Sequence, residues 1–356
     1  NLFGGHVEGG WVEVLVPPGR LGNGVPLGDE EVFGFFAVKG TRFDVAGRIP
    51  PVRDSKGSII FFGTNVDITL SNGNVFLPSG RTVAASDGTL TIRDGHIKPV
   101  IGKLDIQVAG GADAVLELAS YEPIDVSRFI DIAPDELSGT VKGNVKADIP
   151  LTRDVAPKTL DWNVALSYDD LAIARPFEGQ KVKEANGTIV VDPGKAVIEA
   201  KARLNDLPAT LHLVEPLGSN KDARVRRISA DMDDKARHAI VPGLDPILSG
   251  VAKVSVDGVA GDGRLFEVDL KSATLSLPWA GWSKGAGVPA TASFKMHNAN
   301  GRSRLENFKL RGETFSASGT VSLQGDAVER IRFSPMRLNR GDDFSVDVER
   351  KGKGYN

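Results

Sequence analysis

The sequence predicts a mostly β fold: an elongated, twisted antiparallel sheet of repeated units, curved into a groove, with a few short helices. Three observations support this prediction. Apolar residues alternate with polar ones along most of the chain, helical periodicity is confined to two short places, and segments of the sequence recur after about a hundred residues.

The alternation is clearest from Leu137 to Leu151, where every second residue is apolar or glycine and the residues between are mostly polar or charged. A period of two is typical of a strand with one buried and one wet face. Because one face is wet, the sheet is expected to be antiparallel. The same pattern recurs at Val66/Ile68/Leu70, Leu104/Ile106/Val108, Ile198/Ala200/Ala202/Leu204, Ala209/Leu211/Leu213, Val254/Val256, Ala292/Phe294/Met296, Ala317/Gly319/Val321/Leu323 and Phe344/Val346/Val348.

Helical periodicity is scarce. Apolar residues at positions i, i+3 and i+4 behind an aspartate predict two short helices with capped N-termini. These places are Val126/Phe129/Ile130 after Asp125, and Ala236/Ala239/Ile240 after Asp233 and Asp234.

The chain also repeats itself. Residues 79–95 align without gaps on residues 178–194, and the triplet Leu-Ser-Gly follows each expected helix, at 137–139 and at 248–250. A fainter third copy covers residues 290–301. Repeats of this kind indicate stacked units that share a continuous core. We expect three of them, at residues 1–120, 121–232 and 233–356.

Composition excludes several classes of protein. The chain has 356 residues, 41% of them hydrophobic, a net charge of −3 with the two signs interspersed, and no cysteine. Nucleic acid is therefore not expected as a partner, and disulfides and thiolate metal sites are excluded. No stretch approaches the roughly 20 consecutive apolar residues of a membrane-spanning helix. Since the sequence opens without a methionine or a leader, we expect a fragment whose anchor lies outside it.

Catalytic motifs are missing. The five histidines show no metal-binding spacing, and His212 lies on the polar side of a predicted strand. Neither a phosphate-binding P-loop nor a Gly-x-Ser-x-Gly elbow is present. Adjacent aspartates at 169/170, 233/234 and 342/343 are better explained as turn and cap residues than as catalytic pairs. We expect a protein that is not an enzyme, with no cofactor and no metal.

The apolar side of the predicted strands remains as the candidate site. Two short helices cannot cover a sheet of this length, so the sheet either packs on itself as a sandwich or stays open as a groove for hydrocarbon. The alternation places aliphatic and aromatic residues along that side. The predicted lining residues are Val141, Val145, Ile149, Leu166, Ile189, Val191, Leu211, Leu213, Val254, Val256, Phe294, Met296, Val321 and Leu323.

Several short motifs occur along the chain: Ile49-Pro50-Pro51, residues 77–81 and 87–92, Leu137-Ser138-Gly139 and Ile149-Pro150-Leu151. Together they resemble the periplasmic region of the AsmA-like proteins related to YhdP. The resemblance covers residues 40 to 325 and carries no catalytic residue. It implies a bridge-like lipid transfer protein of the Gram-negative cell envelope, anchored in the inner membrane, whose repeating β-groove carries phospholipid towards the outer membrane.

We therefore expect a periplasmic segment, tethered to the inner membrane, that shelters the acyl chains of phospholipid and supports outer-membrane biogenesis. Outer-membrane or other envelope proteins are further expected partners. The alternative is a structural or adhesive β-repeat scaffold of the envelope without a lipid ligand. A third reading is a carbohydrate-binding β protein that uses an exposed pair of tryptophans, Trp279 and Trp282, as a stacking platform.

Overall fold

The computed structural model describes residues 2–20, 22, 24–44, 47–122, 124–151, 160–177, 179–217, 224–258, 263–277, 280–299, 301–325, 327–351 and 354–355. The chain divides into two compact units. Unit 1 comprises residues 1–198 and 216–221, and unit 2 comprises residues 199–215 and 222–356. None of the helices in the described ranges is long and apolar enough to cross a membrane.

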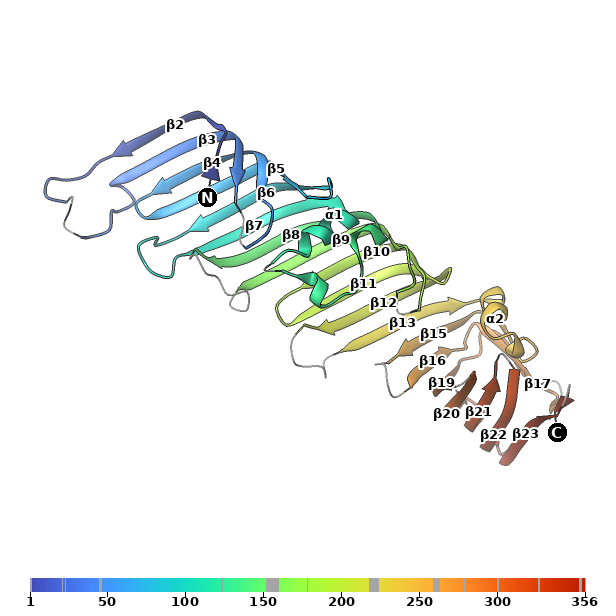
Figure 1. Ribbon diagram of the computed structural model, residues 1–356. Helices are drawn as coiled ribbons and strands as arrows, with labels where there is room; N and C mark the ends of the chain where they lie inside the picture. The colour runs from blue at the N-terminus through green and yellow to red at the C-terminus, as the bar shows by residue number, and fades with distance from the viewer. Residues whose placement is uncertain are drawn as a thin grey trace. The chain divides into compact units, whose positions relative to one another are not determined.

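Unit 1 is an open antiparallel sheet whose strands lie side by side in chain order (Figure 1). Strand β3 pairs with β1 and β2 on one side and with β4 on the other, and each strand from β4 to β9 pairs with the next strand of the chain. The strands are β1 (Leu2–Phe3), β2 (His6–Val14), β3 (Val32–Phe43), β4 (Val52–Phe62), β5 (Asn65–Phe76), β6 (Thr82–Ile92), β7 (Ile101–Gly111), β8 (Leu137–Pro150), β9 (Asp161–Ile173) and β10 (Val182–Val191). The next strand, β11 (Lys195–Leu204), begins in unit 1 and continues into unit 2.

Unit 2 repeats this meander. Its main strands pair in the order β12, β13, β15, β16, β19, β20, β21, β22 and β23, all antiparallel, while β14, β17 and β18 form a separate three-stranded sheet. The strands are β12 (Leu207–Pro216), β13 (Val225–Met232), β14 (Leu248–Gly250), β15 (Ala252–Asp257), β16 (Arg264–Asp269), β17 (Ala273–Leu277), β18 (Trp282–Lys284), β19 (Ala290–Ala299), β20 (Arg302–Gly312), β21 (Ser316–Gln324), β22 (Ala327–Arg337), β23 (Phe344–Lys351) and β24 (Gly354–Tyr355).

The prediction of a mostly β chain with open, antiparallel pairing and a few short helices is confirmed. Helix α2 (Asp234–Ile240) lies where the periodicity predicts it, and the Asp233 side chain caps it by accepting a hydrogen bond from the Ala236 backbone N–H at 2.8 Å. Short 3₁₀ turns lie at Val126–Arg128 (η1) and Pro134–Glu136 (η2), before β8, and at Pro242–Leu244 (η4), directly after α2.

The helix predicted around residue 126 is wrong. That segment forms only the single turn η1, and the real helix is α1 (Ala112–Ala119), which directly follows β7. Asp125 does not cap a helix, because its carboxylate accepts a hydrogen bond from the Ser127 hydroxyl and its backbone is left-handed. The alanine, leucine and glutamate of residues 112–119 are strong helix formers, so propensity rather than the capping pattern locates the helix.

The sequence repeat corresponds to a structural repeat. Gly80 and Gly179, which align with each other, both have left-handed backbones, with φ of +88° and +80°. A strand follows each of them, β6 or β10, and each strand contains a bulge near its Asx-Gly pair. The two copies therefore share a left-handed glycine followed by a bulged strand. The proposed repeat boundaries after residues 120 and 232 stay a prediction.

Candidate functional site

One face of unit 1 is apolar across neighbouring strands. In the strand register Ile106 of β7 lies opposite Val145 of β8, Val145 lies opposite Val164 of β9, and Val164 lies opposite Val191 of β10. Directly opposed residues project to the same side of a sheet. Aliphatic side chains from four neighbouring strands therefore form one row on the same face of the sheet.

A second row of the same face extends to the other end of unit 1. Leu104 lies opposite Leu90, which lies opposite Ile68, then Ile59, then Phe36 of β3. All of these side chains are half-buried. We call this surface the apolar face of unit 1; its members include Phe36, Ile59, Phe61, Val66, Ile68, Leu90, Ile92, Leu104, Ile106, Val145, Ala147, Ile149, Trp162, Val164, Leu166, Ile189 and Val191.

The opposite face is charged along β5 to β10. Lys146 Nζ lies 3.2 Å from a carboxylate oxygen of Asp105, and Arg93 lies 2.5 Å from Asp67. These pairs are exposed, so they contribute solubility rather than much stability. From β5 to β10 the sheet of unit 1 is therefore amphipathic. At β2 to β4 the opposite face is apolar as well, and it carries Trp11, Phe33, Phe35, Ile60 and Phe62.

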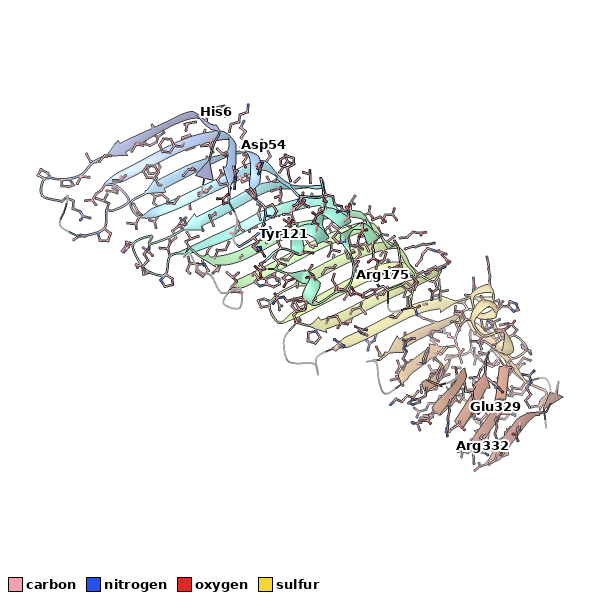
Figure 2. All side chains as sticks on the ribbon, viewed as in Figure 1. His6, Asp54, Tyr121, Arg175, Glu329 and Arg332 are labelled. Atoms are coloured by element: carbon pink, nitrogen blue, oxygen red, sulfur yellow. The ribbon has the colours of Figure 1, made fainter. Side chains whose placement is uncertain are left out.

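Helix α1 covers only one end of that apolar face. Its Ala114 joins a buried cluster with Val83 and Ala85 of β6, which are 0% and 2% exposed, and Tyr121 just after the helix packs against the same cluster (Figure 2). Towards the other end of the strands, Leu104, Val145 and their neighbours in the rows remain half-buried. The uncovered part is a continuous aliphatic tract.

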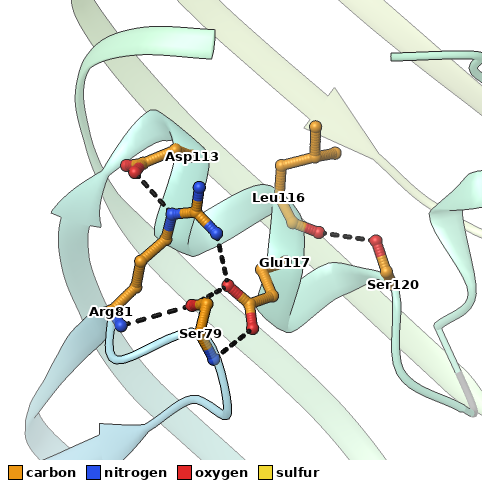
Figure 3. Close-up of polar contacts among 6 residues, drawn as sticks. All are labelled: Ser79, Arg81, Asp113, Leu116, Glu117 and Ser120. Atoms are coloured by element: carbon orange, nitrogen blue, oxygen red, sulfur yellow. Dashed lines mark hydrogen bonds and ion pairs between the residues drawn. The ribbon is translucent and has the colours of Figure 1, made fainter. Parts of the chain in front are cut away.

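Ion pairs fasten α1 to the turn between β5 and β6 (Figure 3). The Arg81 guanidinium lies 2.7 Å from Asp113 and 2.9 Å from Glu117, and Glu117 also accepts hydrogen bonds from the Ser79 hydroxyl and backbone N–H. Burial alone would raise the pKa of Glu117, but the hydrogen bonds from Ser79 and Arg81 outweigh it and hold that pKa below its usual value.

The Glu117 interaction predicts a pH-dependent attachment of α1. Because the folded-state pKa is lowered, its stabilisation is fully present above the unfolded value of about 4.3 and is lost as the pH falls from there through the folded-state pKa. We expect Glu117→Gln to destabilise α1 by about 1–2 kcal/mol at pH 7 and to have little effect near pH 3. Hydrogen exchange of residues 112–119 at both pH values measures this. Glu122→Gln, at an exposed side chain, is the control; an equal effect of Glu117→Gln at both pH values would contradict the assignment.

Unit 2 has an apolar face of its own. Leu211, Ile228 and Val256 lie opposite one another on β12, β13 and β15, and Val256 lies opposite Phe266. From there the face becomes aromatic. Stacked rings run from Phe266 to Phe294, Phe308 and Phe333, with centroid distances of 5.0, 6.1 and 5.2 Å.

Short elements cover part of the apolar face of unit 2. The three-stranded sheet packs Ala273 and Leu275 into a buried cluster with alanines of β15 and β19, and Val241 before η4 packs against Val321 and Leu323. Lys284 of β18 is 3% exposed and donates hydrogen bonds to the carbonyls of Leu270 and Ala273. Burial lowers the pKa of this lysine.

The predicted lining residues fall on the apolar face of their own unit, by register. Val141 is 8% exposed and lies beside the start of α1, opposite Gly110; Val321 and Leu323 are also buried. Contact of these residues with lipid stays a prediction. The half-buried members are Val145, Ile149, Leu166, Ile189, Val191, Leu211, Leu213, Val254, Val256, Phe294 and Met296.

The prediction omitted the half of the apolar face that β3 to β7 supply. The alternation at Ile68 and Leu104 was sufficient to include these strands. It also missed the phenylalanine row, because Phe266, Phe308 and Phe333 come together only through pairing across β16, β19, β20, β21 and β22.

Trp282, the member of the tryptophan pair that lies within the described residues, does not form an exposed stacking platform. Trp282 donates its indole N–H to the Leu338 carbonyl at 2.8 Å, and its ring packs edge-on against Phe315 at 4.9 Å. It is thus an anchor in the core of unit 2, and Trp279 lies outside the described residues. His212 is paired with Glu199 at 2.5 Å on a partly exposed surface.

Comparison with known proteins gives no relative: no family model, no curated protein and no solved structure matches the chain. Within the described ranges, no group of three or more histidine, aspartate or glutamate side chains could hold a metal ion. The apolar faces are the features on which the functional proposal rests.

Proposed function

We propose that this protein is a non-enzymatic lipid-binding segment of the cell envelope, and that the apolar face of unit 1 shelters the acyl chains of phospholipid. The observation that carries the proposal is the half-buried apolar tract that crosses β3 to β10 while α1 covers one end of it. A contiguous apolar surface of this kind marks a site that binds an apolar partner.

The energetics favour hydrocarbon as that partner. Removing one CH₂ group from water is worth about 0.8 kcal/mol, so an acyl chain of about sixteen carbons gains on the order of 12 kcal/mol. Aliphatic residues such as Val145, Val164 and Leu166 offer no fixed polar group to hold the chain at one place. A lipid could therefore move along the face passively, without an energy-consuming step.

The cellular setting of the proposal comes from the resemblance to AsmA-like proteins. On that basis we place the chain in the periplasm of a Gram-negative bacterium, tethered to the inner membrane by a segment outside this sequence. Phospholipid passing towards the outer membrane would be its cargo, and outer-membrane or other envelope proteins would be its docking partners.

An envelope scaffold without lipid is the second candidate. The covering of unit 2 favours it, because the β14–β17–β18 sheet packs its Ala273 and Leu275 against Ala252 of β15 and Ala290 of β19, which are only 2% and 4% exposed. If unit 1 were sealed by a partner protein in the same manner, the aliphatic tract would be an ordinary core surface.

Native mass spectrometry separates the two candidates. The chain is expressed in the periplasm of a Gram-negative bacterium and purified without detergent. We expect a population with bound phospholipid, identified by its mass and by extraction into organic solvent. Protein of the apo mass, with no phospholipid in the extract, would leave the scaffold as the better account.

A further inference from the structure

Arginines interrupt the apolar face of unit 2 at one end of its strands. Arg224 Nε lies 2.8 Å from Glu215 Oε2, and Arg226 Nε lies 2.6 Å from Glu215 Oε1. Two guanidinium groups thus share one carboxylate. This group carries a net positive charge even when both ion pairs are intact.

The register places this group on the same side as the hydrocarbon. Arg226 lies opposite Leu213, two residues along β13 from Ile228, which lies opposite Leu211. Side chains two residues apart on a strand project to the same face. Arg227 projects to the other face, where it pairs with Asp257 at 3.0 Å.

A third arginine lies next to the group formed by Arg224, Arg226 and Glu215. Arg264 of β16 lies opposite Met296 and two residues from Phe266, so it belongs to the apolar face as well. Gly258 connects the two arginine-bearing strands: its N–H donates to the Arg226 carbonyl at 3.3 Å, and a Cβ built on it would lie 3.4 Å from Arg264 Cα.

The spacing suits a single small anion. Strands β13 and β16 are separated by β15, which puts their backbones about 10 Å apart. Long arginine side chains from both strands can reach a group between them. Arg224 and Arg226 both pair with Glu215, and Arg264 has no ion pair within the described part of the chain.

We propose that Arg224, Arg226 and Arg264 bind the phosphate of a phospholipid headgroup while its acyl chains lie on the adjoining apolar face of unit 2. The planar guanidinium matches a phosphate through paired N–H donors. Leucine, isoleucine and phenylalanine directly beside the charge supply the hydrocarbon contact. An anionic amphiphile satisfies both parts of the surface, whereas a free phosphate satisfies only one. This inference rests on the proposed lipid-binding function and assigns its headgroup site.

Two soluble short-chain lipids test it: dioctanoyl phosphatidylglycerol and dioctanoylglycerol, which has the same chains without the phosphate. Calorimetry with the full chain gives both affinities. Changing Arg224, Arg226 and Arg264 together to glutamine is expected to weaken phosphatidylglycerol binding at least about tenfold and to leave dioctanoylglycerol unchanged. The matched control changes three arginines of the opposite face, Arg227, Arg304 and Arg332, which removes the same charge.

Each outcome has a defined meaning. Selective loss of phosphatidylglycerol binding in the apolar-face variant supports the site. Equal losses in the two variants, or inorganic phosphate that binds wild type as tightly as phosphatidylglycerol does, would overturn it while leaving lipid binding intact. If wild type binds neither lipid, the proposed function itself fails. Circular dichroism confirms that both variants are folded.

Discussion

Leu166→Asp is expected to reduce the phospholipid that co-purifies with the protein at least about tenfold, since a carboxylate against hydrocarbon costs several kcal/mol. Leu166 lies in β9 between Gly143 and Ile189, and its side chain extends over Gly143. A charge there would interrupt the aliphatic tract of unit 1 near its middle. Native mass spectrometry, normalised to folded protein, gives the amount of bound lipid.

The neighbouring residue provides the control. Ala165 is exposed on the opposite face of β9, so Ala165→Asp adds the same charge without touching the tract. We expect this variant to retain wild-type lipid. If both aspartates reduce the lipid equally, the loss reflects net charge or folding, and the apolar face of unit 1 is not the binding surface.

Gly57→Ala is expected to destabilise unit 1 by roughly 2–4 kcal/mol. A Cβ at this position would lie 1.9 Å from the Thr69 carbonyl oxygen and 3.0 Å from its carbon. Both atoms belong to the backbone of β5, so they cannot move without breaking the pairing of β4 with β5. Hydrogen exchange of residues 52–76 reports the loss locally, which matters because the chain has two units.

Gly9→Ala is the matched substitution for that experiment. Gly9 also lies in a strand, β2, but a Cβ there would have no atom within 4 Å and its backbone is not left-handed. Its exchange is expected to stay at the wild-type level. Protection of β4 and β5 that survives Gly57→Ala would show that the two strands are not paired as closely as described.

The strands and their apolar sides were predictable because alternation with a period of two residues indicates both that a segment is a strand and which of its sides is apolar. The run Leu137 to Leu151 is β8 almost to the residue, and Val145 and Ile149 lie on the expected side. Alternation within one strand contains no information on its partners. For this reason the row from Ile106 to Val191 could be identified only after pairing was known.

The covering elements were less predictable. Helix α1 is only eight residues long, and the pattern around Val126 resembles a capped helix more than Ala112–Ala119 does. The strands β14, β17 and β18 are three to five residues long, too short for alternation to separate them from loops. These elements decide which part of each apolar face stays open, so the extent of the site required the structure.

The arginine group at the end of the apolar face of unit 2 illustrates the same limit. Arg224 and Arg226 are close in sequence, but Glu215 and Arg264 join them through pairing of β12 with β13 and through Gly258 beside β16. In the sequence nothing distinguishes these three arginines from the many other charged residues interspersed along the chain. Only the register shows that they lie on the hydrocarbon side.

Site-specific photocrosslinking in living bacteria tests the central claim most directly. A photoreactive amino acid is placed at Val145, on the apolar face of unit 1, or at Lys146, the next residue, on the charged face. We predict crosslinks to phospholipid from position 145 and none above background from position 146. Crosslinks to protein alone from position 145, or equal lipid capture at both positions, would contradict the account.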